Sequence, residues 1–360
     1  MLAILLFIIF LSFLIFLHEF GHFLAAKKNG VRVEEFGFGY PPRIFSFKKG
    51  ETIYSFNLLP FGGFVKILGE DGKEPQNPLS FAFQKPGKKF LILIAGILMN
   101  LIFGLIILSF GYFVGLPALA TPQNLTQLEE INLSILEVAP QSPAEKAGLK
   151  PGDIILKVEK DDNFLEKPTV KSFQEFSKKY PDQSINLSIK RGKEIFRKEV
   201  FVRANPPQGQ GPLGIAIGET GILRYSLGES FYYGFRDGLR LFFNIFLLLY
   251  FYLKALILKT GTFGTLVGPV GIVSLGSQVM KLGSGYLLQF LASLSIYLAA
   301  LNLLPIPALD GARLVFVLIE KLRGRPVSFR VESLIHSLGF AFLIFLMIWI
   351  TFQDISRLFS

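Results

Sequence analysis

The 360-residue chain is 51% hydrophobic and only 18% charged, and its mean hydropathy is +0.48. Soluble globular proteins carry about a quarter charged residues, so this composition excludes an ordinary soluble protein as well as a disordered or collagen-like chain. The chain has no Cys, which excludes disulfide scaffolds and thiolate chemistry and leaves His and carboxylates as the only side chains for a metal. The net charge of +10 comes from Lys and Arg beside apolar runs, where they indicate membrane orientation rather than nucleic-acid binding.

Residues 1–26 form the first predicted transmembrane helix. They are apolar from Leu2 to Leu17 except at Ser12, and at about 1.5 Å per residue they can cross a bilayer of about 30 Å. A signal peptide is the alternative, but it needs a basic start and a small-residue cleavage site, and both are missing here. We therefore expect a retained span.

The loop of residues 27–89 is predicted to lie on the cytoplasmic side. It carries eleven Lys or Arg against six Asp or Glu, and cytoplasmic loops are enriched in basic residues. Short alternating segments with Gly turns predict β-strands in this loop. The second transmembrane helix is predicted over 90–117, which places the following residues on the outer side.

Residues 125–205 are less apolar and are punctuated by Pro and Gly, which predicts a small soluble β-rich domain. Its segment VAPQSPAEKAGLKPGDIILKV, residues 138–158, resembles a stretch typical of PDZ domains. PDZ domains bind extended peptides by adding a strand to a sheet edge, so the domain is expected to sense or filter substrates. The alternative is a spacer without a ligand.

The rest of the chain contains two further predicted spans. Residues 206–285 comprise a linker and an ambiguous helix, 231–258, that mixes charges with an apolar stretch. We expect a third transmembrane helix over 286–311, a cytoplasmic loop over 312–333 and a fourth transmembrane helix over 334–356.

The motif LHEFGH places His18 and His22 on one helical face with Glu19 beside them. This is the spacing of zinc ligands with an adjacent general base, and ionisable groups in a membrane span are candidates for function. A third ligand is expected. Asp310 is preferred because it ends an apolar helix after two prolines and reaches a similar depth, whereas His336 is expected to be an interfacial or packing residue.

Two motifs carry a family resemblance. HEFGH at 18–22 and NLLPIPALDG at 302–311 are similar to the HExxH and NxxPxPxLDG motifs of the site-2 protease family of intramembrane zinc metalloproteases. The order of first span, cytoplasmic loop, second span, PDZ domain and LDG span resembles the bacterial regulator-of-sigma-E protease branch. Some members of that branch have two PDZ domains, whereas this chain shows one.

The resemblance implies roles for particular residues. It implies that His18, His22 and Asp310 bind Zn²⁺ and that Glu19 is the general base. It also implies that Asn302 contacts the main chain of the substrate and favours its unwinding. The alternative for Asn302 is that it caps the broken helix.

The predicted fold is therefore a polytopic α-helical membrane protein with about four transmembrane helices, a membrane-associated β-loop and an inserted PDZ domain. If 231–258 crossed the bilayer, Asp310 would lie on the face opposite His22, so we expect this helix to lie on the outer surface or dip into it. The resemblance implies a re-entrant β-loop that binds the substrate as an added strand, with Tyr54 and Phe56 expected on its edge. The alternative is a purely structural hairpin.

The expected function is hydrolysis of peptide bonds within transmembrane segments of single-pass membrane proteins. The resemblance implies anti-sigma factors or remnant signal peptides as substrates, the bacterial cytoplasmic membrane as location and an active site near the cytoplasmic side. A catalytically silent PDZ adaptor is the alternative, but such a protein has no need of Glu19. A metal transporter would need ligands spread along a path rather than at one depth.

Overall fold

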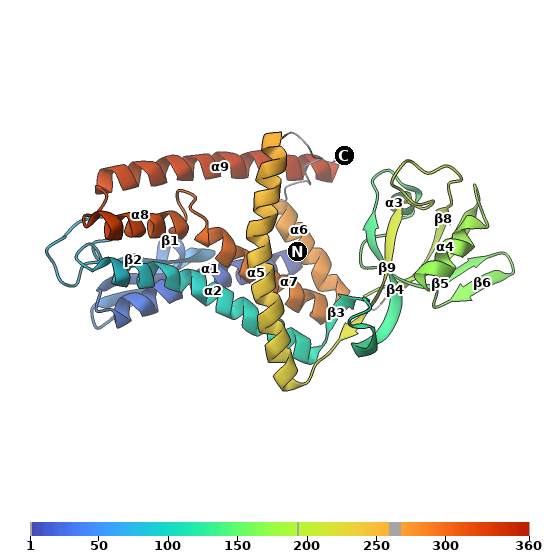
Figure 1. Cartoon of the computed structure of the whole chain (residues 1–360), viewed down its shortest axis with the longest axis horizontal. Coiled ribbons are helices and arrows are strands. Elements are labelled where there is room, and N and C mark those ends of the chain that lie inside the picture. Colours follow the sequence, from blue (N-terminus) through green and yellow to red (C-terminus); the bar gives the residue numbers. More distant parts are fainter. Residues whose placement is uncertain (1, 193, 259–267, 360) are drawn as a thin grey trace. The chain divides into compact units, whose positions relative to one another are not determined.

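The computed structural model describes residues 2–192, 194–258 and 268–359, and the chain divides into two compact units (Figure 1). The first, the helix unit, consists of Met1–Leu108, Gly234–Ser277 and Phe290–Ser360. The second, the sheet unit, consists of Ser109–Tyr233 and Gln278–Gln289. Residues 259–267 of the predicted segment 206–285 lie outside the described residues.

Long apolar helices dominate the helix unit. The main helices are α1 (Leu2–Lys28), α2 (Pro86–Val114), α5 (Leu227–Leu258), α6 (Pro269–Leu282), α7 (Ser284–Leu303), α8 (Asp310–Arg323) and α9 (Phe329–Phe359). Among the described residues, α1, α2, α5, α7 and α9 contain stretches that are long and apolar enough to cross a membrane.

Contacts within the helix unit give the direction of α1 and α7. Phe7 near the start of α1 packs against Phe290 in the first half of α7, with ring centroids 5.8 Å apart. At the other end, His22 near the end of α1 lies 3.3 Å from Asp310, seven residues beyond the end of α7. The two helices therefore run in the same direction.

Helix α2 runs opposite to α1 and α7. Its early residue Ile92 contacts His22 near the end of α1, whereas Phe103 packs 5.5 Å from Phe13, earlier in α1. The end of α2 and the start of α7 thus lie at the same end of the bundle. The segment between α2 and α7 therefore starts and finishes at the same end of the bundle.

Helix α5 takes a different course from the other long helices. Figure 1 shows α5 running across α1, α2 and α9 rather than along them. Gly238 lets α5 approach closely, because a Cβ at this position would meet the side chain of Leu105 on α2. Phe242 of α5 is buried in the core formed with α2, α7 and α8.

The β-loop between α1 and α2 consists of β1 (Val33–Lys49) and the antiparallel β2 (Thr52–Ile67). Its register is irregular. Residues 35–38 of β1 pair with residues 63–66 on one side and with residues 53–56 on the other. The end of β1 also pairs with residues 53–56. Segment 63–67 therefore forms an outer edge. The expectation that Tyr54 and Phe56 lie on the edge was wrong, since each has a partner on both sides.

The sheet unit contains one seven-stranded sheet. Its strands are β3 (Leu116–Leu119), β4 (Leu128–Val138), β5 (Ile154–Lys160), β6 (Asn163–Glu166), β7 (Ser184–Arg191), β8 (Glu194–Phe201) and β9 (Ile215–Leu223). The order is β3-β9-β4-β5-β7-β8, with β6 paired to β5. The unit also holds η1 (Leu125–Gln127), α3 (Pro143–Lys146) and α4 (Val170–Lys178).

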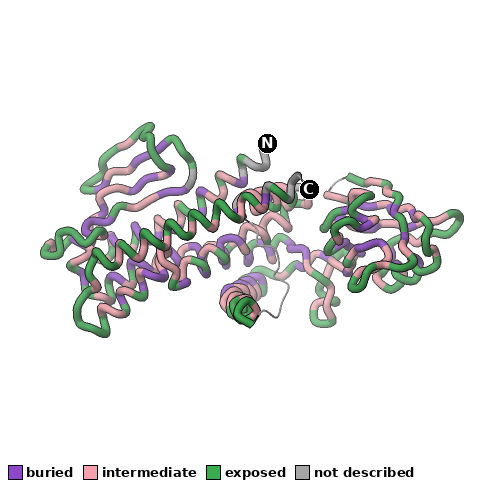
Figure 2. Tube along the Cα trace, turned by 90° about the horizontal axis from the view of Figure 1, so that it is seen from above, coloured by how far each residue is buried: buried purple, intermediate pink, exposed green. Residues whose placement is uncertain are grey.

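The sheet unit folds around alternating apolar residues. Ile185, Leu187 and Ile189 of β7 all point into its core, and the purple segments in Figure 2 mark such buried positions. Ser142 and Thr169 cap the N-termini of α3 and α4 by accepting hydrogen bonds from backbone N–H groups. The sheet extends beyond the predicted boundaries 125–205, because β3 and β9 lie outside them and β9 pairs with β4.

Two predicted boundaries near the LDG motif were also wrong. The predicted helix 286–311 ends at Leu303, and Asp310 instead begins α8, which occupies part of the predicted loop 312–333. Pro305 and Pro307 explain the break, since proline lacks the N–H group that continues a helix.

Candidate metal centre

Three side chains converge at the end of α1. His18 Nε2 lies 2.7 Å from Asp310 Oδ2, and His22 Nε2 lies 3.3 Å from the same oxygen. The two Nε2 atoms are 3.1 Å apart. Among the described residues, these three are the group of His, Asp or Glu side chains placed to hold a metal ion.

Glycines allow this convergence by bringing α1 and α2 together. A Cβ at Gly96 of α2 would meet the ring of His22, and a Cβ at Gly21 of α1 would meet the backbone of Ala95. Position 21, between the two histidines, and position 96, which faces them on α2, therefore both require a small residue. The imidazole of His22 occupies the space that a side chain at position 96 would fill.

The orientation of His22 suits metal binding. Its Nδ1 lies 2.8 Å from the carbonyl oxygen of Ile92, so Nδ1–H donates and the Nε2 lone pair faces Asp310. The Nδ1 of His18 is buried without a hydrogen-bond partner in the part of the chain that the structure describes. Two imidazole nitrogens and one carboxylate oxygen match a catalytic zinc site, whose donor atoms lie roughly 3.3 Å apart for bonds of about 2.0–2.2 Å. The donor set fits Zn²⁺.

Glu19 lies beside this centre and contacts the β-loop. Its Oε2 accepts a hydrogen bond from the backbone N–H of Val65 at 3.1 Å. Glu19, His22 and Asp310 line one cavity of about 230 Å³ together with Phe64 and Val65. The edge segment 63–67 therefore forms one wall of the cavity that contains the candidate base.

Sequence reasoning missed the ion pair of Arg313 and Glu70 at the same cavity. Arg313 lies one turn after Asp310 on α8 and pairs with Glu70, just after β2. Burial lowers the pKa of Arg313, but the charges of Glu70, Asp310 and Glu332 and the hydrogen bond to Glu70 together outweigh it, so the pKa lies above its usual range. The i, i+3 spacing from Asp310 was the signal in the sequence that could have identified Arg313.

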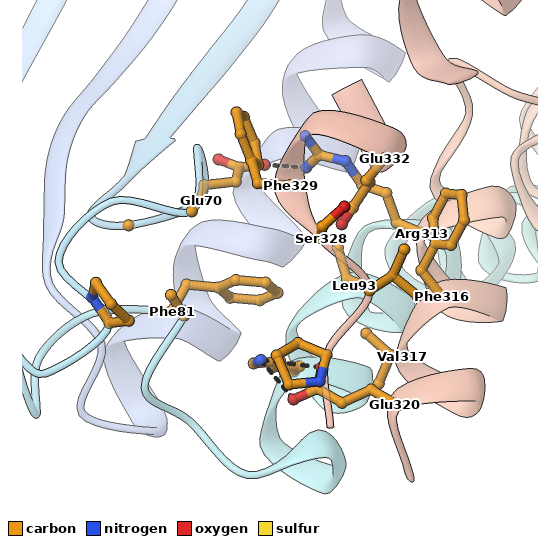
Figure 3. A pocket seen from close by; sticks show the side chains of 17 residues that line it. Glu70, Phe81, Leu93, Arg313, Phe316, Val317, Glu320, Ser328, Phe329 and Glu332 are labelled. Atoms are coloured by element: carbon orange, nitrogen blue, oxygen red, sulfur yellow. Dashed lines mark hydrogen bonds and ion pairs between the residues drawn. The ribbon is translucent and has the colours of Figure 1, made fainter. Parts of the chain in front are cut away.

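A second pocket of about 320 Å³ adjoins this ion pair. Figure 3 shows Glu70 and Arg313 facing each other at its margin, with Phe81 beside it. Lys89 and Glu320 form a buried ion pair at 2.9 Å in its wall. The two cavities share Glu70, Phe81, Leu93 and Arg313 as lining residues, so they adjoin at the ion pair.

The other two predicted residues lie apart from the three converging side chains. Asn302 is half-buried in the last turn of α7 and is not among the residues that line the cavity around Glu19. His336 lies on α9 and its Nδ1 accepts a hydrogen bond from the backbone N–H of Ala308 at 3.0 Å. His336 also packs against the ring of Phe316, as the predicted packing role requires, and the hydrogen bond adds a specific polar contact.

Comparison with known proteins gives matches along almost the whole chain. The family model described as peptidase family M50 matches residues 6–346. A zinc metalloprotease named RasP from Shouchella clausii is 30% identical over 442 residues, covering 99% of this chain and 100% of the relative. RasP of Oceanobacillus iheyensis, also named a zinc metalloprotease, is 30% identical and covers 98% of each chain. The regulator of sigma-W protease RasP of Bacillus subtilis is 29% identical over 98% of each.

Proposed function

The chain belongs to peptidase family M50 and is a multi-pass membrane zinc metalloprotease with Zn²⁺ as its cofactor, and we propose that His18, His22 and Asp310 bind this ion while Glu19 is the general base. The observation that carries the proposal is the convergence of the three donor atoms, two of whose residues, His22 and Asp310, line one cavity with Glu19. We further propose that the peptide bonds it hydrolyses lie within transmembrane segments of single-pass membrane proteins.

Hydrolysis of a peptide bond requires the metal ligands and the general base to lie close together. Zn²⁺, when bound, activates a water molecule and polarises the scissile carbonyl group. The Glu19 carboxylate takes a proton from the attacking water and passes it to the leaving amide nitrogen. The hydrogen bond from Val65 N–H holds the Glu19 carboxylate at the cavity. Because this bond uses Oε2, the other carboxylate oxygen of Glu19 can accept the proton.

A transmembrane substrate arrives as a helix whose amide groups are bonded internally, so it has to unwind before hydrolysis. The edge segment 63–67 offers backbone groups that can pair with an unwound strand next to Glu19. We assign to Asn302, in the last turn of α7, a contact with the main chain of the substrate. This assignment rests on the family resemblance alone. The edge supports strand addition as the mode of substrate binding.

The directions of the helices support four full crossings by α1, α2, α7 and α9. Because α2 ends and α7 begins at one end of the bundle, α5 and α6 together produce no net crossing. The course of α5 across the bundle supports a helix that lies along the membrane surface. We assign the metal centre to the cytoplasmic side because the basic loop 27–89 follows α1.

The sheet unit is assigned to the extracytoplasmic side, as a PDZ-like domain that binds a peptide of the substrate. The capped helix α3 and the strand β5 that follows it lie at the positions of the PDZ-like sequence segment. Membrane-bound anti-sigma factors are the favoured substrate class, because one relative is named a regulator of sigma-W protease. Remnant signal peptides are the second class.

The test is cleavage of a tagged single-span substrate in liposomes by the wild type and by Glu19→Gln, with zinc quantified on both. We expect about one zinc per chain in both proteins and cleavage by the wild type alone. Equal cleavage by both would exclude Glu19 as the base. Folded wild type without zinc would exclude the metal centre and favour a silent adaptor.

The topology is tested with single cysteines, because the chain has none of its own. Cysteines at Ser284 and Asp71, both exposed, are treated with a membrane-impermeant maleimide on intact cells. We expect labelling at 284 and protection at 71. Protection of both positions, with labelling only after permeabilisation, would show that α5 makes a net crossing.

A further inference from the structure

The loop between α7 and α8 holds an unusual backbone conformation close to Asp310. Ala308 has a φ of +80°, in the left-handed region that residues with a Cβ rarely adopt. Asp310 follows only two residues later and begins α8. The conformation of Ala308 therefore determines where the carboxylate of Asp310 points, and a contact outside the loop is needed to keep it.

His336 on α9 provides that contact. The backbone N–H of Ala308 donates a hydrogen bond to His336 Nδ1 at 3.0 Å. Gly339, one turn further along α9, faces Pro307 so closely that a Cβ at this position would meet it. Helix α9 thus contacts the loop at two consecutive residues, through one hydrogen bond and one close backbone approach.

The hydrogen bond also specifies the state of the imidazole. Nδ1 can accept only if it carries no proton, so the ring is neutral with its proton on Nε2. The Nε2 atom is buried and finds no hydrogen-bond partner among the residues that the structure describes. The ring of Phe316 on α8 lies 5.8 Å away and packs against the imidazole. Within the described ranges, the polar contact of the ring is therefore the one to Ala308.

We propose that His336 is a positioning residue for the metal centre, which holds the Ala308 backbone so that Asp310 faces His18 and His22. The proposal rests on the proposed function, in which Asp310 is a zinc ligand. Residues that orient metal ligands from outside the first coordination sphere commonly change metal affinity by about 10–100-fold. His336 acts on Asp310 through two residues of backbone and does not itself contact the metal donors.

The test compares three substitutions of His336 in the full-length protein, with zinc affinity measured by competition against a chelator. In Asn the side-chain oxygen lies near the position of Nδ1, whereas in Gln it reaches further, towards the position of Nε2. We expect His336→Leu and His336→Gln to weaken zinc binding about tenfold or more, and His336→Asn to restore most of it. Ser337→Ala, at the neighbouring exposed position, is the control and should leave zinc affinity unchanged.

A second substitution tests the mechanism. Glycine adopts positive φ without the steric cost that alanine has, so Ala308→Gly removes the need for an external contact. We expect Ala308→Gly to recover part of the zinc affinity when combined with His336→Leu. Unchanged zinc affinity and turnover in His336→Leu, or equal losses in the Asn and Gln variants, would overturn the proposal.

The failure of this inference is distinguishable from failure of the proposed function. Asp310→Ala removes the proposed ligand itself and should abolish zinc binding. If Asp310→Ala loses zinc while His336→Leu retains it at wild-type affinity, only the role of His336 is wrong. If Asp310→Ala retains zinc at wild-type affinity, the ligand assignment is wrong and the role of His336 falls with it.

Discussion

Each of the two units holds a carboxylate that nitrogen atoms surround, but the surroundings differ. In the sheet unit, Asp153 is completely buried and accepts hydrogen bonds from Arg191 at 2.6 and 2.7 Å and from the Lys150 N–H at 2.8 Å. Arg191 also donates to the carbonyl oxygen of Gly148. The Asp153 carboxylate thus meets hydrogen-bond donors only, and the guanidinium of Arg191 meets acceptors only. This is the arrangement expected of a structural ion pair.

In the helix unit, Asp310 faces two imidazole nitrogens that also face each other. His18 Nε2 and His22 Nε2 are 3.1 Å apart, and His18 Nδ1 is buried without a partner among the described residues. His22, whose Nδ1–H donates to the carbonyl oxygen of Ile92, directs its Nε2 lone pair at the Asp310 carboxylate, and two facing acceptors need a proton or a cation between them; on the proposed ligand assignment this is Zn²⁺. The balance of donors and acceptors around a carboxylate, and not its burial, therefore separates a candidate metal centre from a structural ion pair.

The largest expected effect comes from neutralising the carboxylate in the helix unit. In Asp310→Asn the side chain keeps its shape but loses the charge that stabilises a divalent cation. We expect bound zinc to fall from about one per chain to nearly zero, with proteolysis lost and the fold kept. Metal analysis and hydrogen exchange on the purified protein measure the two properties, and full zinc occupancy would contradict the comparison.

The same change in the sheet unit should act on stability alone. Asp153→Asn leaves the half-buried Arg191 without its charged partner, so the cost should lie below the about 3–5 kcal/mol of breaking a fully buried pair. We expect faster hydrogen exchange across Ser109–Tyr233 with zinc content unchanged. Asp161→Asn, at an exposed position, is the control and should change stability by less than about 0.5 kcal/mol.

A third prediction concerns the packing that brings His22 into place. Gly96→Ala puts a methyl group where the ring of His22 lies, so we expect zinc affinity to fall about tenfold or more. Gly87→Ala on the same helix is the matched control, because a Cβ there meets nothing within 4 Å. Chelator competition measures both variants. Equal affinities would mean that the ring of His22 can shift without loss of metal binding.

The smallest effect is expected from Arg191→Lys. Lysine keeps the charge but cannot form the two parallel hydrogen bonds to Asp153, so stability of the sheet unit should fall by about 1–2 kcal/mol. The hydrogen bond to Asp153 raises the pKa of Arg191. A base with a raised pKa stabilises the fold until the pH rises through that value, so the contribution should be constant between about pH 6 and 9. Thermal unfolding across this pH range tests both statements.

The sequence predicted the local features of the metal centre and missed the contacts between distant segments. Helical periodicity alone placed His18 and His22 on one face of α1. Asp310 was predicted from its depth and its place after two prolines, but its expected position at the end of an apolar helix was wrong because Pro305 and Pro307 end that helix before it. The role of His336 depends on the path of α9 relative to a loop 28 residues away, which no local pattern specifies.

The β-loop illustrates the same limit. Its alternating residues and Gly turns predicted strands, but the double pairing of residues 35–38 depends on a register that changes along β1. The edge was therefore placed at Tyr54 and Phe56 instead of at segment 63–67. In the sheet unit, β9 was predicted as part of a linker because its long-range pairing with β4 leaves little local signal.

The distance along the chain between the residues of the metal centre sets when it can form during synthesis. His22 and Asp310 are 288 residues apart, so the ribosome adds most of the protein after α1 before the last donor exists. At about 5–20 residues per second this takes roughly 15–60 s. On the proposed ligand assignment, a nascent chain that already carries both histidines and Glu19 therefore has no complete centre and is expected to be inactive towards neighbouring membrane proteins while its own helices are being inserted.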